Sequence, residues 1–184
     1  MEKEIKCTID NLYHCLTHFE KIDNASKVAL VNAGYTKEQI NEQLAKPGSK
    51  FCSGFGTSPL EIIKKLRQEC PEVITNIPKP DSSGRIRLSF VLNEVIGNDE
   101  VVETGTLTEE ELSTMRTEFR NDCIIRKVKA SRVVLTKECQ VVLAVRQDVY
   151  DIITLYPGIQ APPLPKDGET DSFWDNHCFI ENEK

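Results

Sequence analysis

The sequence lacks several features that would assign it to a well-known class. It has no run of roughly 18 to 20 apolar residues, the length that a membrane-spanning helix needs. Its first residues, MEKEIKCTIDNLYHC, are too polar for a signal peptide. Its seven cysteines include no CxxC pair and no spacing typical of a zinc site. We therefore expect a protein of the cytoplasm, without membrane contact and with reduced cysteines.

Motifs for nucleotides, serine nucleophiles and metals are also missing. The stretch SGFGTS lacks the lysine of a phosphate-binding P-loop, and the chain has neither a GxSxG elbow nor a GxGxxG loop after a strand. His14 and His18 are four residues apart, as two ligands on one helix face would be. Zinc needs a third protein ligand, however, and an HExxH motif would need a glutamate where Cys15 stands. We expect no metal and no cofactor.

Charge is distributed unevenly along a chain with a formal net charge of -6. Between Arg120 and Arg146, seven basic residues against two acidic ones give +5. Such a basic segment can attract a polyanion even when the whole protein is acidic. The alternative is a pair of strands whose lysines and arginines simply face solvent.

Residues 1–76 carry the periodicity and the start signals of helices. Apolar residues recur at intervals of three and four between residues 8 and 19, which is the pattern of one helix face. NASKVALVNAG predicts a second helix, and Thr36 with Gln39 forms a capping box for a third. Ser58 followed by Pro59 begins a fourth. The two prolines and turn residues of segment 77–84, IPKPDSSG, predict a linker.

After residue 84 the period changes from helical to alternating. RIRLSFVL and DEVVET predict strands, and Thr108 with Glu111 forms a capping box that starts the helix EEELSTMRTEFR. CIIRKVK, CQVVLAVR and YDIITLY predict three more strands, the last two joined as a hairpin. The expected fold class is α+β: N-terminal helices, then a domain of residues 85–184 with a small twisted antiparallel sheet of about four to five strands and one flanking helix.

The order of features in the C-terminal part resembles that of a known group of nucleases. VIGNDEVVET is followed by TEFR, a basic stretch, the hairpin CQVVLAVRQDVYDIITLYPG, APPLP and FWDNH. Over residues 85–181 this arrangement resembles small bacterial and phage-associated ribonuclease domains of the Barnase, EndoU, colicin and RelE group. The resemblance implies a metal-independent endoribonuclease, such as a toxin or phage-defence effector, that offers the concave face of its sheet to RNA. The helices of residues 1–76 lie outside the resemblance and are expected to regulate the domain or to dock a protein partner.

Cleavage of RNA without a metal requires a base for the ribose 2′-hydroxyl, an acid for the leaving oxygen and cations around the phosphate. His177 is the only histidine of the C-terminal part and is the candidate acid or base. Thr154 and Tyr156 are two residues apart in a strand, so they share a face of the sheet and can donate hydrogen bonds to a phosphate. They also match the Thr and Tyr that similar nucleases carry before a proline. Packing of Tyr156 against prolines is the alternative.

The remaining candidates are cations and one aromatic residue. Arg146 ends a strand of the hairpin and is predicted to clamp a phosphate at the catalytic site. Lys127 and Lys129 share one face of their strand, with Lys127 expected to be catalytic and Lys129 to bind substrate. Looser contacts with the RNA backbone are expected from Arg120 and Arg132. Trp174 is predicted either to stack on a base or to anchor the end of the chain.

Two other classes of function are compatible with the sequence. The acidic net charge favours a non-catalytic interaction module, such as an immunity or antitoxin-like binder, whose basic strands only face solvent. A third class is another enzyme on a similar sheet, for example a transferase that uses a nucleotide. The carboxylates around His177 would raise the pKa of its imidazole if they were close, but they would also repel RNA.

Overall fold

Several helices of the first 76 residues begin where the sequence predicts. In the computed structural model, which describes residues 3–182, the Thr36 hydroxyl and the Gln39 side chain accept from each other's backbone N–H, so the capping box is confirmed. Ser58 caps a helix with Pro59 in its first turn. The helices of this region are α1 (Ile9–Cys15), η1 (Leu16–His18), α2 (Asn24–Asn32), α3 (Lys37–Ala45), α4 (Pro59–Glu69) and α5 (Pro71–Thr75). Among all helices within residues 3–182, none has the length and apolar character to cross a membrane.

The first sheet is built around the expected hairpin. β9 (Glu138–Arg146) and β10 (Val149–Pro157) pair antiparallel, as predicted. β3 (Arg85–Val91) pairs with the other edge of β9 and buries alternate residues, which also agrees with the sequence. β1 (Glu4–Lys6) runs parallel to β10, so the order of the sheet is β1-β10-β9-β3.

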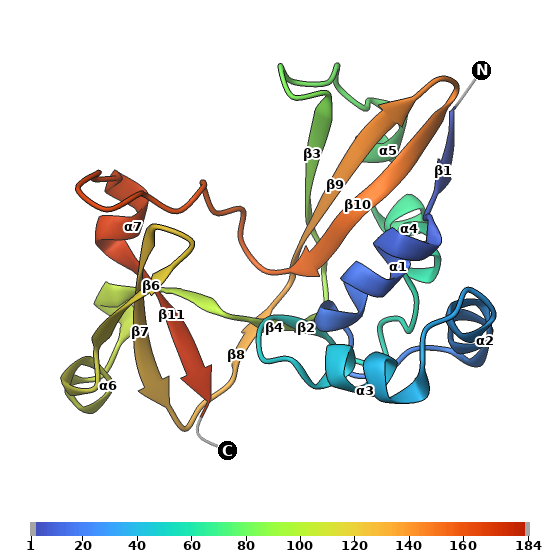
Figure 1. The fold of residues 1–184 in the computed structure, drawn as a ribbon. Helices are drawn as coiled ribbons and strands as arrows, with labels where there is room; N and C mark the ends of the chain where they lie inside the picture. Colours follow the sequence, from blue (N-terminus) through green and yellow to red (C-terminus); the bar gives the residue numbers. More distant parts are fainter. Residues whose placement is uncertain (1–2, 183–184) are drawn as a thin grey trace.

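The second sheet belongs to a smaller lobe. It stands beside a larger lobe that contains the first sheet and the N-terminal helices (Figure 1). The order of the second sheet is β5-β11-β7-β6, and its central strand β11 runs parallel to β7 and antiparallel to β5. The elements of the smaller lobe are β5 (Val101–Glu103), η2 (Thr104–Thr106), α6 (Glu109–Ser113), β6 (Arg116–Arg120), β7 (Cys123–Ala130), α7 (Ser172–Asn176) and β11 (His177–Asn182).

A short third sheet connects the two lobes. β4 (Gly97–Asp99) pairs with β2 (Lys50–Phe51) on one side and with β8 (Val134–Thr136) on the other. The approach of β2 requires glycine at residue 97, since a Cβ there would lie 2.2 Å from the carbonyl oxygen of Lys50. The smaller lobe is therefore an insertion between β3 and β9 that the C-terminal strand completes.

Each lobe has its own hydrophobic core. The larger core combines apolar side chains of the N-terminal helices with those of β3, β9 and β10. The smaller core consists of Val102, Val128, Ala130, Cys178 and Ile180. The segment 77–84 does not separate these two cores, because the helices before it cover the apolar face of the sheet after it.

The fold is α+β, as expected, but it is not a single antiparallel sheet with one flanking helix. Within residues 3–182 the strands form three sheets, two of which contain parallel pairs. The helix that Thr108 caps ends at Ser113, and TEFR belongs to strand β6. Thr117 and Phe119 favour a strand, and pairing with β7 outweighs the helical start signal. The acidic tail forms α7 and β11, two elements that no sequence pattern predicted.

Candidate functional site

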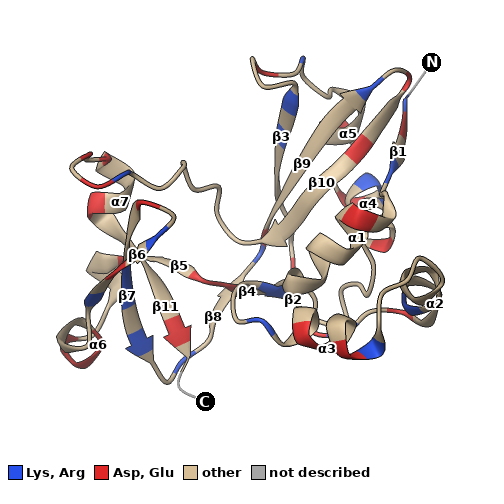
Figure 2. Ribbon diagram, in the orientation of Figure 1, with Lys and Arg blue, Asp and Glu red and all other residues tan. Residues whose placement is uncertain are grey.

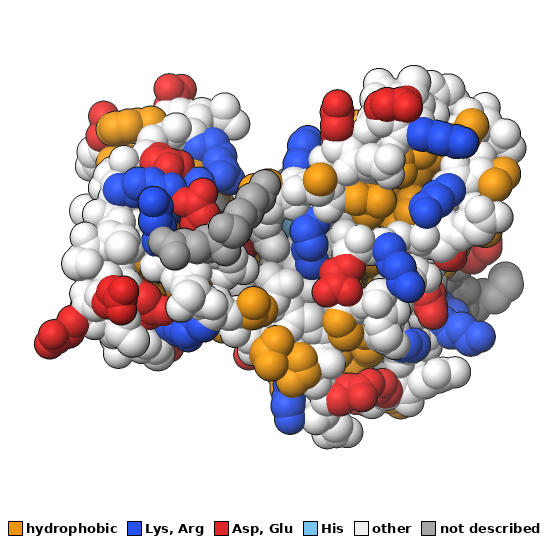
Figure 3. Space-filling view, turned by 90° about the horizontal axis from the view of Figure 1, so that it is seen from below, with side chains coloured by type: hydrophobic (Ala, Val, Ile, Leu, Met, Phe, Trp, Pro, Cys, Tyr) orange, Lys and Arg blue, Asp and Glu red, His pale blue; other side chains and the backbone are white. Residues whose placement is uncertain are grey.

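A cleft of about 1050 Å³ lies between the two lobes, beside the third sheet. Residues 45–48 and Lys50, from the end of α3 to the start of β2, line one side, and strands β6, β7 and β11 line the other. Its volume is at the upper end of the range for small-ligand sites, roughly 300–1,000 Å³. The charged residues that line it are Lys46, Lys50, Arg116, Arg120, Lys127, Lys129, Asp99, Glu100 and Glu181. Basic and acidic side chains gather on the smaller lobe where it faces the larger one (Figure 3).

The register of the second sheet places these charges on one face. Arg116 is opposite Lys127 across β6 and β7, and Lys127 is opposite Phe179 across β7 and β11. Lys129 is opposite Glu181 in the same way. Because side chains alternate along a strand, Lys127 and Lys129 share the face that lines the cleft, as predicted. Figure 2 shows the basic residues of β7 next to the acidic end of β11.

Ion pairs partly neutralise this face. Arg116 pairs with Glu118 at 3.1 Å and also contacts Glu181. Lys127 Nζ lies 2.9 Å from the other carboxylate oxygen of Glu118. These pairs lower the pKa values of Glu118 and Glu181, chiefly because the carboxylates accept hydrogen bonds from the cations. The pairs also fix the orientation of the two cations along the cleft wall.

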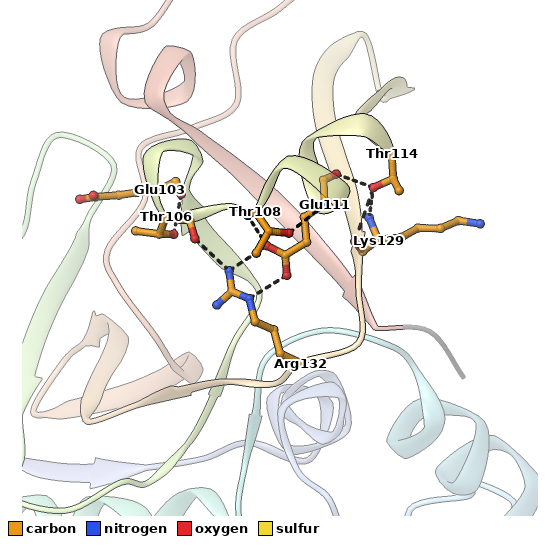
Figure 4. A network of polar contacts seen from close by, with 7 residues as sticks. All are labelled: Glu103, Thr106, Thr108, Glu111, Thr114, Lys129 and Arg132. Atoms are coloured by element: carbon orange, nitrogen blue, oxygen red, sulfur yellow. Dashed lines mark hydrogen bonds and ion pairs between the residues drawn. The ribbon is translucent and has the colours of Figure 1, made fainter.

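Three other cations of the cleft remain available to a ligand. The side chains of Lys46, Arg120 and Lys129 make no ion pair or hydrogen bond within the part of the chain that the structure describes, and all three are exposed. The backbone N–H of Lys129 donates to the Thr114 hydroxyl, which anchors the strand, while its side chain extends away from that contact (Figure 4). Unpaired cations at the mouth of a cleft can bind anionic groups such as phosphates.

A carboxylate stands among these cations. Glu100 follows β4, and burial raises its pKa above the usual value, with a smaller upward contribution from Asp99. The charges of Arg120, Lys127 and Lys50 oppose this shift without reversing it. The carboxylate also packs against Gly48, where a Cβ would lie 3.1 Å from Glu100 Oε2. A carboxyl group with a raised pKa in a cationic cleft is a candidate for proton transfer.

The neighbouring carboxylate has a structural role. Asp99 accepts hydrogen bonds from the backbone N–H of Val101 at 3.0 Å and of Ile159 at 2.9 Å. Its pKa is also raised, because it is buried. These bonds connect the start of β5 to the chain that leaves β10, so Asp99 holds the two lobes in their relative position.

The structure does not bring the predicted catalytic residues of the hairpin together. Arg146 pairs with Asp151 beside the hairpin turn. Tyr156 lies opposite Gln140, six residues along β9 from Arg146, which corresponds to about 20 Å. The hydroxyl of Thr154 is buried and has no hydrogen-bond partner among residues 3–182. A hairpin places residues near its turn opposite each other, so Arg146 meets Val149 instead of the Thr154 region.

His177 also lies apart from that hairpin. It belongs to β11 in the smaller lobe, where its ring stacks on Phe173 with 3.8 Å between the ring centroids. Its Nδ1 is 2.7 Å from the Phe173 carbonyl oxygen. His177 lines neither the cleft nor the smaller cavity beside it. The spatial assumption behind a site of His177, Thr154, Tyr156 and Arg146 is therefore not met.

Of the other predicted binding residues, some line the cleft and the others only stabilise the fold. Arg120, Lys127 and Lys129 line the cleft. Arg132 forms a two-pronged contact with Glu111, at 2.7 and 3.2 Å, within a polar network behind the cleft wall (Figure 4). Trp174 is 8% exposed, and its indole N–H donates to the carbonyl oxygens of Pro162 and Pro163. It anchors the proline-rich segment, which is the packing role that was its alternative.

Sequence reasoning missed Glu100, Lys46 and Lys50. The only local signal for Glu100 is an acidic pair, Asp99 and Glu100, between a glycine–asparagine pair and an apolar pair. Lys46 precedes the two-residue strand β2 and Lys50 begins it, and so short a strand has no recognisable pattern. These residues reach the cleft only because β2 pairs with β4, a contact that residues about fifty positions apart in the chain make.

Metal ligands and known relatives give no further assignment. Among residues 3–182, no group of three or more His, Cys, Asp or Glu side chains is placed to hold a metal ion. His18 Nδ1 lies 3.0 Å from the carbonyl oxygen of Ser49, and burial lowers its pKa to about 4. All seven cysteines are free thiols. Comparisons with protein-family models, curated proteins and solved structures found no match to the chain.

Proposed function

We propose that the cleft between the lobes binds a strand of RNA and that the protein cleaves it without a metal, with Glu100 as the general base. The observation that carries this proposal is the position of Glu100: a carboxyl group with a raised pKa, close enough to Arg120 and Lys127 for their charges to act on it. The same cations can neutralise a phosphate next to the base.

The residues of the cleft fit a transesterification. The ionised Glu100 accepts the proton of a ribose 2′-hydroxyl, whose oxygen then forms a bond to phosphorus. The bond from phosphorus to the 5′-oxygen breaks, and that oxygen takes a proton from water. Arg120 and Lys127 face the charge that develops on the phosphate. Lys46 and Lys129, which have no ion-pair partner in the described chain, hold the neighbouring phosphates.

The experiment uses the full chain, a short fluorescent single-stranded RNA and EDTA. We expect cleavage products that carry 2′,3′-cyclic phosphate and 5′-hydroxyl ends, identified by mass spectrometry. Glu100→Gln should lower the rate by at least roughly 100-fold, because it removes the base but keeps the shape of the side chain. Glu103→Gln is the matched control, since Glu103 is exposed on β5 and outside the cleft. Equal cleavage by both variants would reject Glu100 as the base.

A non-catalytic interaction module is the second candidate. The acidic net charge and the ion pairs of Arg116 and Lys127 favour it, because they weaken the attraction of the cleft for a polyanion. The same assay separates the two functions. An intact RNA that neither binds nor is cleaved by the wild-type protein would favour the interaction module.

A further inference from the structure

A second, smaller cavity of about 280 Å³ adjoins the cleft. Asp99, Glu100 and Phe179 line both, so the smaller cavity lies directly beside the cleft. Its volume is close to the lower end of the range for small-ligand sites, roughly 300–1,000 Å³. It therefore suits one compact group that is attached to a larger ligand.

One wall of this cavity is a fixed aromatic surface. The rings of Trp174 and Phe179 are stacked, with 5.1 Å between centroids and 18° between planes. The two carbonyl oxygens that accept from the indole of Trp174 hold this pair in place. Ile159 and Ala161 contribute apolar side chains to the lining. A flat, apolar ring can pack against such a wall without ordering any further side chain.

The polar groups of the cavity are few and lie next to the cleft. Tyr156 lines this cavity, its hydroxyl makes no hydrogen bond to any part of the chain that the structure describes, and burial raises its pKa. Glu100 supplies an acceptor on the side shared with the cleft. A group that combines a flat apolar ring with donors and acceptors at its edge matches this arrangement.

We propose that the smaller cavity holds a nucleobase of the RNA strand whose phosphates lie in the cleft. This inference rests on the proposed function. The base packs along the wall that Phe179 and Trp174 form and directs its polar edge toward the Tyr156 hydroxyl and Glu100. The cleft then binds the phosphate backbone of any sequence, whereas the smaller cavity contributes a contact that only a base can make.

The chain contains a single tryptophan, so its fluorescence reports directly on the wall of the cavity. We would titrate the full-length protein with each ribonucleoside 5′-monophosphate and with ribose 5-phosphate, which has the same phosphate but no base. At least one nucleotide should quench Trp174 and bind at least tenfold more tightly than ribose 5-phosphate. Binding of ribose 5-phosphate, measured by calorimetry, should leave the fluorescence unchanged.

Two variants locate the contact. Ala161→Phe fills the cavity. It should lower the affinity for the nucleotide to that for ribose 5-phosphate, and it should leave the affinity for ribose 5-phosphate unchanged. Tyr156→Phe removes one hydroxyl and should lower only the affinity for the nucleotide, by about three- to tenfold. Ala33→Phe, which adds the same ring at an exposed position, is the control. Circular dichroism establishes that each variant is folded.

The outcomes separate the inference from the proposed function. Equal affinities of the wild type for nucleotide and ribose phosphate would overturn the base site and leave the phosphate-binding cleft intact. The base site would also be overturned if both cavity variants still bound the nucleotide more tightly than ribose 5-phosphate. If neither ligand bound the wild type, the proposal that the cleft binds phosphate groups would be rejected, and the base site with it.

Discussion

The carboxylate of Asp99 occupies the space directly beside the backbone of Gly158. A Cβ at residue 158 would lie 2.6 Å from Asp99 Oδ1, and the φ of +129° at this position suits only glycine. Two independent reasons therefore require glycine where the chain leaves β10, next to a carboxylate that connects the two lobes.

Gly158→Ala should lower the free energy of unfolding by about 2 to 4 kcal/mol, because the methyl group forces Asp99 to move and the backbone into a strained conformation. Urea unfolding would measure the change. Gly105→Ala is the comparison: a Cβ there has no neighbour within 4 Å and the φ is not positive, so we expect a change within about 0.5 kcal/mol. Similar losses in both variants would contradict the role given to Asp99.

The pH dependence of activity should follow the ionisation of Glu100. Only its carboxylate form can accept a proton, so kcat/KM should rise with pH until the raised pKa of Glu100 is passed and then level off. Rates measured between pH 4 and 9 on the fluorescent RNA would test this. A profile that falls over the acidic range would exclude Glu100 as the base.

The same group should leave a signature in stability. The folded state holds the proton of Glu100 more tightly than the unfolded state, because burial raises the pKa. The wild type should therefore lose stability relative to Glu100→Gln as the pH rises from the ordinary glutamate pKa through the raised value, and the difference should be constant at higher pH. Urea unfolding of both proteins over this range gives the comparison. The opposite slope would mean that the cations of the cleft, and not burial, dominate at Glu100.

The salt dependence of RNA affinity should report how many phosphates bind if the cleft is the proposed RNA site. Arg120→Ala and Lys129→Ala should each reduce the slope of log Kobs against log salt concentration by about 0.7, the value for one phosphate contact with a single strand. Fluorescence anisotropy with the labelled RNA would provide the affinities. Arg85→Ala serves as the reference, because Arg85 is exposed on β3 in the larger lobe and does not line the cleft. If Arg85→Ala changed the slope as much as the two cleft variants do, the RNA would be bound outside the cleft.

The fragment of residues 85–184 should not fold by itself. β3, β9 and β10 would expose the apolar face that α1, η1 and α4 cover in the whole chain, including Ile86, Leu88 and Phe90. Amide exchange should find no protected hydrogen bonds in the hairpin of the fragment, although the full chain protects them. A fragment with protected amides and a cooperative unfolding transition would support the predicted domain division at residues 77–84.

Local patterns in the sequence predicted local structure well. The capping boxes at Thr36 and Thr108, the alternation of β3 and the β9–β10 hairpin all depend on neighbours within a few residues. The same alternation placed Lys127 and Lys129 on one face, and that face lines the cleft. These features need no information about the rest of the chain.

Long-range pairing was beyond such patterns. The start signal at Thr108 says nothing about the strand partner that converts residues 116–120 from helix to β6. No pattern in the acidic and aromatic residues of β11 predicted a strand, which forms because β5 and β7 flank it. Glu100 became a candidate only when the fold buried it among cations from separate segments. The cleft is a product of topology, and its residues share no motif.

The central position of β11 also has a consequence for synthesis. A ribosome releases β5, β6 and β7 long before residues 177–182 emerge, so the second sheet has a gap in its middle until translation has passed this strand. Phe179 and Glu181 arrive with it, and both line the cleft. A nascent chain from which β11 has not yet emerged therefore lacks part of the cleft wall, so the cleft can be complete only after this strand has been synthesised and has paired with β5 and β7.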